Sequence, residues 1–295
     1  MSVNSHRRED IIAVSNLKEE SRIVVFNTAA NSSGAIAELY RFRSETENLT
    51  QRLVKWYYIL GVAELPESNT VQVRNYPWTK KGWFFRLFFD IIFPSKIIRL
   101  SEAEYIISLQ NSLVNIRNKP QLLFVQLCFP FIKYRFPITQ FKLWLYQNII
   151  GLITIYSIRK ATVVVVQNEW MKKACANKAR VNEEKIKILK QSYLSPSILP
   201  KFKPEGISFK TFFYPATSMK YKNHRLLLEA ASIAKQQTDE DVSLVLTVNG
   251  DMTDGTEYLK NMANNVGLDV SFLGTMPHEN VFQLYAHSIL VFPSL

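Results

Sequence analysis

The chain of 295 residues lacks the features that mark several protein classes. Its only two cysteines, Cys128 and Cys175, are too few for a disulfide framework and do not have metal-ligand spacing, which indicates a reducing compartment. Its four histidines are scattered, so neither a zinc nor an iron site is predicted. The G-x-G-x-x-G fingerprint of dinucleotide-binding proteins is also absent. These absences argue against a disulfide scaffold and a zinc or iron site, and the sequence carries no dinucleotide-binding fingerprint.

Long apolar runs are missing as well. Residues 1–22 are polar and charged, with no apolar segment long enough for a signal peptide. The most apolar region, Leu143–Ala161, is interrupted by Gln147 and Asn148, whereas a membrane-spanning helix needs about 20 nearly unbroken apolar residues. We therefore interpret this region as a buried or membrane-surface helix. We expect a cytoplasmic protein, either soluble or peripheral on the inner face of the plasma membrane.

Acidic residues are outnumbered by basic ones, which gives a net charge of +11. Such a surface can be a solvated one that keeps the protein soluble, or it can meet a nucleic acid or an anionic membrane. The segment Trp78–Leu100 mixes Lys80, Lys81, Arg86 and Lys96 with aromatic residues, a combination typical of interfacial membrane helices. A core helix with basic edges would also explain it. Because the chain contains no nucleic-acid motif, we do not expect a nucleic-acid partner.

Short apolar runs alternate with helical patterns along the chain, which predicts α/β domains with parallel sheets. The predicted strands of the first part are Arg22–Asn27, Trp56–Leu60, Val71–Tyr76, Tyr105–Leu109, Leu122–Gln126, Thr162–Gln167 and Lys185–Leu189. Its predicted helices cover about Ile36–Glu47, Gly82–Ile98 and Thr139–Arg159. This order predicts a doubly wound, Rossmann-like domain.

A second β-α series follows a stretch rich in proline, and the last run, Ile289–Phe292, is predicted to be a buried strand. We therefore expect two doubly wound domains that face a cleft at the carboxyl edges of their sheets. The expected organisation is a polar tail at 1–20, a first domain at 21–191, a linker at 192–207 and a second domain at 208–295.

Each domain has a short loop of small residues between its first strand and helix. In the first domain, Ser33 and Gly34 open the helix, where free N–H groups favour an anion or a sugar hydroxyl, although close packing of helix on strand would explain them too. In the second domain, Lys220 and Lys222 precede a helix. A lysine there opposes the helix dipole unless an anion joins it, so the pair is either solvated or binds a diphosphate.

These residues carry a family resemblance. The segments "FFYPATSMKYKNHRLLLEAA" and "FLGTMPHENVFQLYAHSILVFPSL" resemble the donor-binding domain of retaining glycosyltransferases of family 4, which have the GT-B fold. "SSGAIAEL", "EYIISLQNSL" and "VVVVQNEWMKKA" resemble, in order, parts of that family's acceptor domain. The resemblance is greatest to enzymes that assemble capsular, O-antigen or exopolysaccharide chains, and it covers most of Arg22–Leu295.

The resemblance implies a donor such as a UDP- or GDP-sugar, an acceptor glycan that is often lipid-linked, and no tightly bound cofactor or metal. It implies that Lys222, with Lys220 as a second charge, binds the donor diphosphate. It also implies that Ser33 and Gly34 border the cleft, that Gly250 borders the nucleotide, and that Pro293 and Ser294 begin the loop near the donor sugar.

Three departures from the family pattern bear on activity. The family's arginine near the "YPAT" corner has no match, and Lys220 is the candidate to replace it as a point charge. Gln126 stands where related enzymes often have a histidine facing the donor sugar, and an amide can hydrogen-bond but cannot exchange a proton. The family's loop with two glutamates would follow Pro293 and Ser294, and the sequence ends there. The sequence thus predicts a hexosyltransferase-type enzyme with an incomplete second domain and impaired activity. The alternative is a non-catalytic scaffold on the membrane surface that derives from such an enzyme.

Overall fold

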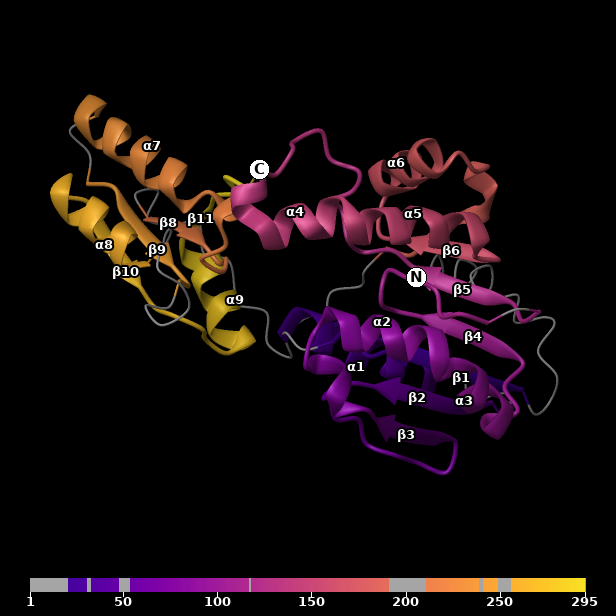
Figure 1. Ribbon diagram of the computed structural model, residues 1–295. Helices are drawn as coiled ribbons and strands as arrows, with labels where there is room; N and C mark the ends of the chain where they lie inside the picture. The colour runs from indigo at the N-terminus through magenta and orange to yellow at the C-terminus, as the bar shows by residue number, and fades with distance from the viewer. Residues whose placement is uncertain are drawn as a thin grey trace, which may run out of the picture. The chain divides into compact units, whose positions relative to one another are not determined.

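The computed structural model describes residues 21–30, 33–47, 54–116, 118–190, 211–238, 241–248 and 256–294. The chain divides into two compact units, residues 1–191 and 192–295, each built around a parallel sheet (Figure 1). The predicted α/β class is therefore confirmed. Each unit is described by itself below.

The described part of the first unit contains a seven-stranded, all-parallel sheet with the order β3-β2-β1-β4-β5-β6-β7. Its strands are β1 (Arg22–Asn27), β2 (Lys55–Leu60), β3 (Val71–Asn75), β4 (Tyr105–Ser108), β5 (Gln121–Phe124), β6 (Val163–Val166) and β7 (Ile186–Ile188). The order reverses between β1 and β4, and ligands of doubly wound sheets bind beyond the carboxyl ends of the strands at such a point.

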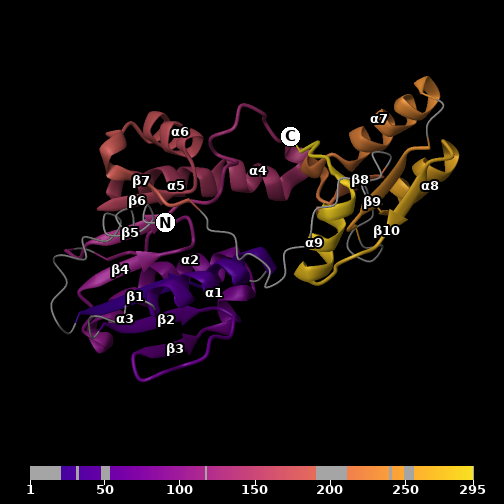
Figure 2. The same ribbon diagram turned by 180° about the vertical axis from the view of Figure 1, so that it is seen from behind.

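Helices cover both faces of this sheet. They are α1 (Ser33–Glu47), α2 (Trp83–Ile92), α3 (Pro94–Ser101), α4 (Phe141–Gln147), α5 (Ile149–Lys160) and α6 (Glu169–Ala179), with short 3₁₀ helices η2 (Pro77–Lys80), η3 (Ile138–Gln140) and η4 (Glu183–Lys185). Ile23 and Val25 of β1 pack in one cluster with Leu39 of α1, whereas Phe26 packs with Phe89 of α2 on the other face. Figure 2 shows the unit from behind.

The sheet register assigns the remaining helices to these faces. Phe26 pairs with Ser108, Ser108 with Leu123, and Leu123 with Val164, so these residues share one face. Leu123 and Val164 belong to the cluster that contains Ile158 of α5 and residues of α6. Helices α2, α3, α5 and α6 therefore cover the same face, and α1 covers the opposite one.

Two predicted helices are interrupted in the structure. The helix expected at Gly82–Ile98 is two helices, because Pro94 has no N–H to continue α2 and instead occupies the first turn of α3. The helix expected at Thr139–Arg159 is divided into α4 and α5 at Asn148. The backbone hydrogen bonds Asn148 N to Trp144 O and Leu152 N to Asn148 O keep these two helices nearly continuous.

The described part of the second unit has a four-stranded parallel sheet of order β10-β9-β8-β11. Its elements are β8 (Thr211–Tyr214), η6 (Lys220–Lys222), α7 (His224–Gln237), β9 (Ser243–Leu246), α8 (Thr256–Asn265), β10 (Asp269–Phe272), α9 (His278–His287) and β11 (Ile289–Leu290). Residues of α7 and α8 pack in one cluster with Tyr214 and Leu246. On the other face, the rings of Phe213 and Tyr285 of α9 lie 5.4 Å apart.

The prediction of a buried strand at Ile289–Phe292 was wrong. Only Ile289 and Leu290 form β11, and Leu290 and Phe292 are 53% and 72% exposed. The reason is that, within the described residues, β11 is an edge strand that pairs only with β8.

Candidate functional site

The first unit has a cavity of about 190 Å³ at the switch point of its sheet. The cavity is lined by residues that follow β1, β4 and β5 and by residues of α1, α2, α4 and α5: Asn27, Ala29, Ala30, Ala35, Glu38, Arg86, Leu109, Gln110, Asn111, Gln126, Leu127, Tyr146 and Ile150. It thus combines two charged groups with several amides and a phenol. This mixture suits a ligand rich in hydroxyl groups.

A buried hydrogen-bond network supports the loop after β1. The N–H and hydroxyl groups of Thr28 both donate to Gln110 Oε1, at 3.2 and 3.0 Å. Gln110 Nε2 in turn donates to both carboxylate oxygens of Asp90, each at 3.0 Å. Arg86 completes the network, because its Nη2 donates to Gln110 O at 3.0 Å and its Nε lies 3.9 Å from Asp90 Oδ2. Helix α2 is thereby tied to the ends of β1 and β4.

Lys80 approaches the same loop from η2. Its Nζ donates to Ala29 O at 2.7 Å, and burial and the neighbouring guanidinium of Arg86 lower its pKa to about 8. Gly61 allows this approach, since a Cβ atom there would lie only 2.8 Å from Cε of Lys80. Two cations of the basic-aromatic segment Trp78–Leu100, Lys80 and Arg86, are therefore engaged beside the cavity.

Asp90 makes the stability of the first unit depend on pH. Burial raises the pKa of its carboxyl group from 3.8 to about 6, although Arg86 and the hydrogen bond from Gln110 oppose the rise. Because the pKa is higher in the folded state, the protonated carboxyl group stabilises the fold relative to the ionised one. This contribution is fully present below the unfolded-state pKa and is lost as the pH rises through the folded-state pKa. We expect a loss on the order of 3 kcal/mol in the free energy of unfolding over this window.

The variant Asp90→Asn tests this dependence, because its neutral amide can still accept the hydrogen bond from Gln110. We expect the difference in unfolding free energy between wild type and variant to change by that amount across the window. Urea unfolding measured at several pH values gives the difference directly. A difference that does not vary with pH would contradict the prediction.

Gln126, the position predicted from the resemblance, lines this cavity and follows β5. Its backbone N–H donates to Asn111 Oδ1 at 2.6 Å, and the N–H of Leu127 donates to the same oxygen at 2.8 Å. Helix α1 begins at Ser33, followed by Gly34, but the side-chain surroundings of these two lie outside the described part of the chain. Their proximity to the cavity stays a prediction.

Sequence reasoning missed Glu38, Gln110, Asn111 and Tyr146 as cavity residues, and it assigned Arg86 to a surface segment. One available signal was the pair Gln110–Asn111, which follows a predicted strand as polar residues at the carboxyl edge. The others depend on which helix packs over which strand.

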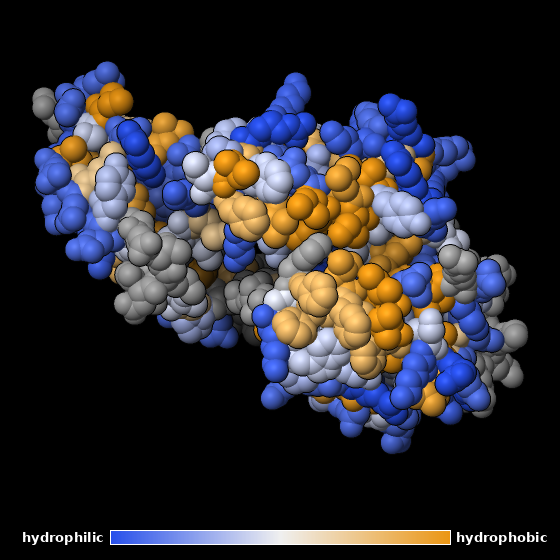
Figure 3. Space-filling view, in the orientation of Figure 1, coloured by the Kyte–Doolittle hydropathy of each residue, from blue (hydrophilic) through white to orange (hydrophobic). Residues whose placement is uncertain are grey.

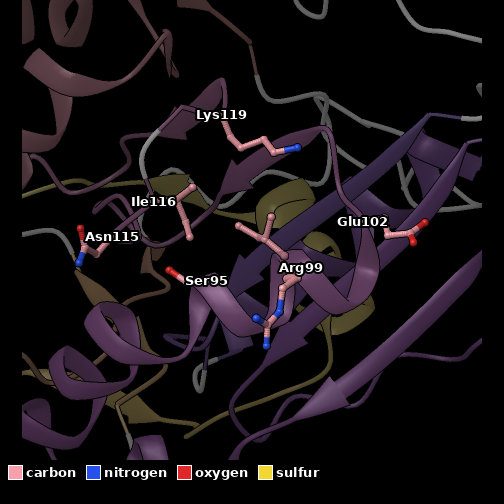
Figure 4. A pocket seen from close by; sticks show the side chains of 7 residues that line it. Ser95, Arg99, Glu102, Asn115, Ile116 and Lys119 are labelled. Atoms are coloured by element: carbon pink, nitrogen blue, oxygen red, sulfur yellow. The ribbon is translucent and has the colours of Figure 1, made fainter.

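A larger hollow of about 660 Å³ lies at the opposite edge of the sheet, near the starts of β4 and β5. Figure 4 shows that its charged side chains do not converge, because Arg99 and Lys119 extend in different directions. Glu102 is already ion-paired with Arg22. We therefore take the smaller cavity, at the carboxyl ends of the strands, as the candidate site.

In the second unit, three segments meet at the hydroxyl group of Tyr214, the last residue of β8. The hydroxyl donates to Lys222 O at 2.9 Å, and its oxygen lies 2.8 Å from Ser294 Oγ. The ammonium of Lys222 lies 5.2 and 5.6 Å from the ring centroids of Tyr221 and Phe292. Lys222 and Ser294, two residues predicted from the sequence, are thus brought together at the carboxyl end of the sheet.

The other predicted residues of this unit are less constrained. Lys220 is exposed in η6, and Pro293 is half-buried beside Ser294. Gly250 lies outside the described residues. His224, which begins α7, is buried, and this burial lowers its pKa, so its imidazole is neutral at pH 7. Among the described residues, no three His, Cys, Asp or Glu side chains gather as metal ligands would.

The variant Tyr214→Phe removes the hydroxyl that joins these segments. We expect it to lower the free energy of unfolding of the second unit by about 1–2 kcal/mol, because two partly buried hydrogen bonds are lost. Hydrogen exchange of the amides in 211–294 measures the change. The control is Tyr285→Phe, which removes a hydroxyl from the more exposed ring on α9. Equal effects of the two substitutions would show that the Tyr214 hydroxyl has no bridging role.

Residues 200–295 match the family model of the group 1 glycosyl transferases. The match covers about a third of the chain and includes every described element of the second unit. No curated protein matches the sequence at a significant level.

Solved structures resemble the fold over most of the chain. The Anabaena protein HepE, in complex with UDP and glucose, has a TM-score of 0.58 at 14% identity, over 93% of this chain and 74% of its own. The lipopolysaccharide outer core galactosyltransferase WaaB has a TM-score of 0.60 at 12% identity, over 93% of this chain and 74% of its own. WaaG, a glycosyltransferase involved in lipopolysaccharide biosynthesis, has a TM-score of 0.57 at 10% identity, over 92% of this chain and 75% of its own. At such low identities the likeness establishes the fold, which is the predicted GT-B.

Proposed function

We propose that this chain is a glycosyltransferase that transfers a sugar, of hexosyl type, from a nucleotide-sugar donor to a growing cell-surface glycan. The observation that carries the proposal is the match of residues 200–295 to the group 1 glycosyl transferases, because the matched segment includes Lys222 and Ser294. The UDP and glucose in the HepE structure support a UDP-sugar as one donor class. The resemblance seen in the sequence leaves a GDP-sugar open as the other.

In this proposal the donor diphosphate binds to the turn between β8 and α7. Lys222 supplies a cation, Lys220 a second one, and the first turn of α7 supplies N–H groups that have no partner within the helix. Pro293 and Ser294 border the donor sugar, and Gly250 borders the nucleotide. No tightly bound cofactor is required for this binding.

The acceptor is proposed to bind to the first unit. Its cavity offers the carboxylate of Glu38, the guanidinium of Arg86 and the amide of Gln126, which can hydrogen-bond saccharide hydroxyls. By resemblance, we assign the enzyme to the retaining family 4, in capsular, O-antigen or exopolysaccharide assembly, with a lipid-linked acceptor at the inner face of the plasma membrane.

The segment Trp78–Leu100 is proposed to contact an anionic membrane. Phe84, Phe88 and Ile92 of α2 are exposed, and Lys81 and Lys96 are exposed nearby. Exposed aromatic residues flanked by cations are the composition of an interfacial helix.

Isothermal titration calorimetry of the chain with UDP- and GDP-sugars tests donor binding, and we expect binding to one of the two classes. Failure to bind any nucleotide sugar would refute the proposal. Transfer of labelled sugar to lipid-linked saccharide then distinguishes an enzyme from a non-catalytic membrane-surface scaffold, which would bind membrane without turnover.

A further inference from the structure

A second exposed apolar surface runs along η3, α4 and α5 of the first unit. It consists of large apolar side chains that are between 40% and 68% exposed: Ile138, Phe141, Ile149, Leu152 and Tyr156. All but Ile138 lie on α4 or α5, and their spacing of three, four or eight residues puts them along one side of these two nearly continuous helices. We call this row the α4–α5 stripe.

Helix α5 has few large apolar residues on its buried side. Its buried residues are Gly151, Thr154, Ser157 and Ile158, of which only Ile158 is large and apolar. Ser157 Oγ accepts a hydrogen bond from Leu113 N at 3.0 Å. Leu152 and Tyr156, in contrast, are 68% and 60% exposed. Helices that face water usually bury such large apolar residues, so the outward face of α5 is suited to apolar surroundings.

The charge around the stripe has one sign. The sequence contains no Asp or Glu between Glu104 and Glu169. The same segment contains seven basic residues, Arg117, Lys119, Lys133, Arg135, Lys142, Arg159 and Lys160. Lys133, Arg135 and Lys142 are exposed near the beginning of the stripe, and Lys160 is exposed at its end. An acid-free apolar face flanked by cations matches the chemistry of an anionic lipid surface.

The stripe lies on the same side of the sheet as α2. Phe89 of α2 packs against Phe26, and Ile158 of α5 belongs to the cluster around Leu123, which shares the face of Phe26. In Figure 3 apolar colouring continues across the side of the first unit that carries α2, α4 and α5. An apolar surface that spans several helices is better suited to a flat, extended partner than to one docked helix of another protein.

We propose that the α4–α5 stripe is a docking surface for an anionic lipid bilayer. This inference deepens the membrane association proposed for Trp78–Leu100, and separate variants keep the two apart. Phe141, Leu152 and Tyr156 insert among the lipid chains, and the flanking cations bind phosphate head groups. Binding therefore weakens as salt concentration rises, without disappearing.

The test is co-sedimentation of the full chain with vesicles of phosphatidylglycerol and phosphatidylcholine, and with vesicles of phosphatidylcholine alone. We expect Phe141→Ser/Leu152→Ser to lower partitioning into the anionic vesicles by at least about tenfold, because two large apolar groups no longer leave water. The matched control is Leu226→Ser/Ile233→Ser, which removes two comparably exposed apolar residues from α7 in the second unit. The variant Phe84→Ser/Phe88→Ser measures the contribution of α2.

Partitioning that is equal for the stripe variant and the α7 control would overturn the inference. If only Phe84→Ser/Phe88→Ser lowers vesicle binding, the membrane association of Trp78–Leu100 stands and the role of the stripe is refuted. The wild type could also fail to bind vesicles and instead form a dimer that the stripe substitutions dissociate in analytical ultracentrifugation. That result would overturn the inference, because the partner of the stripe would be a second copy of the chain rather than a lipid bilayer. Unchanged thermal melting of the stripe variant ensures that lost binding does not reflect unfolding.

Discussion

Replacing Phe89 by alanine is expected to lower the free energy of unfolding of the first unit by about 3–5 kcal/mol. Phe89 is fully buried where α2 meets the sheet. Its ring stacks on Phe93 at 5.3 Å and contacts the rings of Tyr76 and Trp78 at 4.8 and 5.7 Å. Truncation leaves a cavity among three rings from two segments, the start of η2 and the end of α2, so the site cannot close by a single rearrangement.

Tryptophan fluorescence during urea unfolding measures this effect in the first unit alone. The chain has five tryptophans, and all of them lie before residue 192: Trp56, Trp78, Trp83, Trp144 and Trp170. The matched control is Phe88→Ala, the neighbouring residue on α2, whose side chain is 46% exposed. If Phe89→Ala lowers the free energy of unfolding no more than Phe88→Ala does, α2 is not anchored by the aromatic cluster.

Replacing Lys222 by alanine is expected to weaken nucleotide-sugar binding by about 10- to 100-fold, the range of one charge-assisted hydrogen bond to phosphate. The ammonium lies near the rings of Tyr221 and Phe292, and the backbone carbonyl is held by Tyr214. The side chain is therefore placed before the donor arrives. Its loss should change the stability by less than about 1 kcal/mol, because the lost cation–π contact is offset by relief of the helix dipole.

Titration calorimetry of wild type and variant with the same nucleotide sugar measures the change. The control is Lys260→Ala on α8, whose ammonium also lies over a ring, that of Phe272, at 5.7 Å. A wild type that binds no nucleotide sugar would refute the proposed function as a whole. A wild type that binds, and a Lys222→Ala variant that binds equally well, would refute only the role of Lys222.

The candidate site shows why sequence reasoning reached some residues and not others. Gln126 and Ser294 lie shortly after strands, and Lys222 lies in the turn between β8 and α7, so their place at the carboxyl edge follows from the local pattern. Arg86 and Asp90 lie on a helix between β3 and β4, and their contact with Gln110 depends on the crossover that brings α2 over β1 and β4. A periodic pattern indicates that a helix is amphipathic, but it does not identify the strand beneath it.

The α/β class was determined by the sequence itself, because strands that are apolar on both sides require helices on both faces of a parallel sheet. The GT-B fold was implied by the family resemblance and agrees with the solved structures. The direction in which each side chain faces was decided by the tertiary structure. Lys80 and Arg86 donate hydrogen bonds to backbone carbonyls beside the cavity. Leu152 and Tyr156 of α5 face outward, whereas Ile158 of the same helix is buried in the core. The physical reason is that the side of a helix that is buried depends on the partner available to it, and that partner comes from distant parts of the chain.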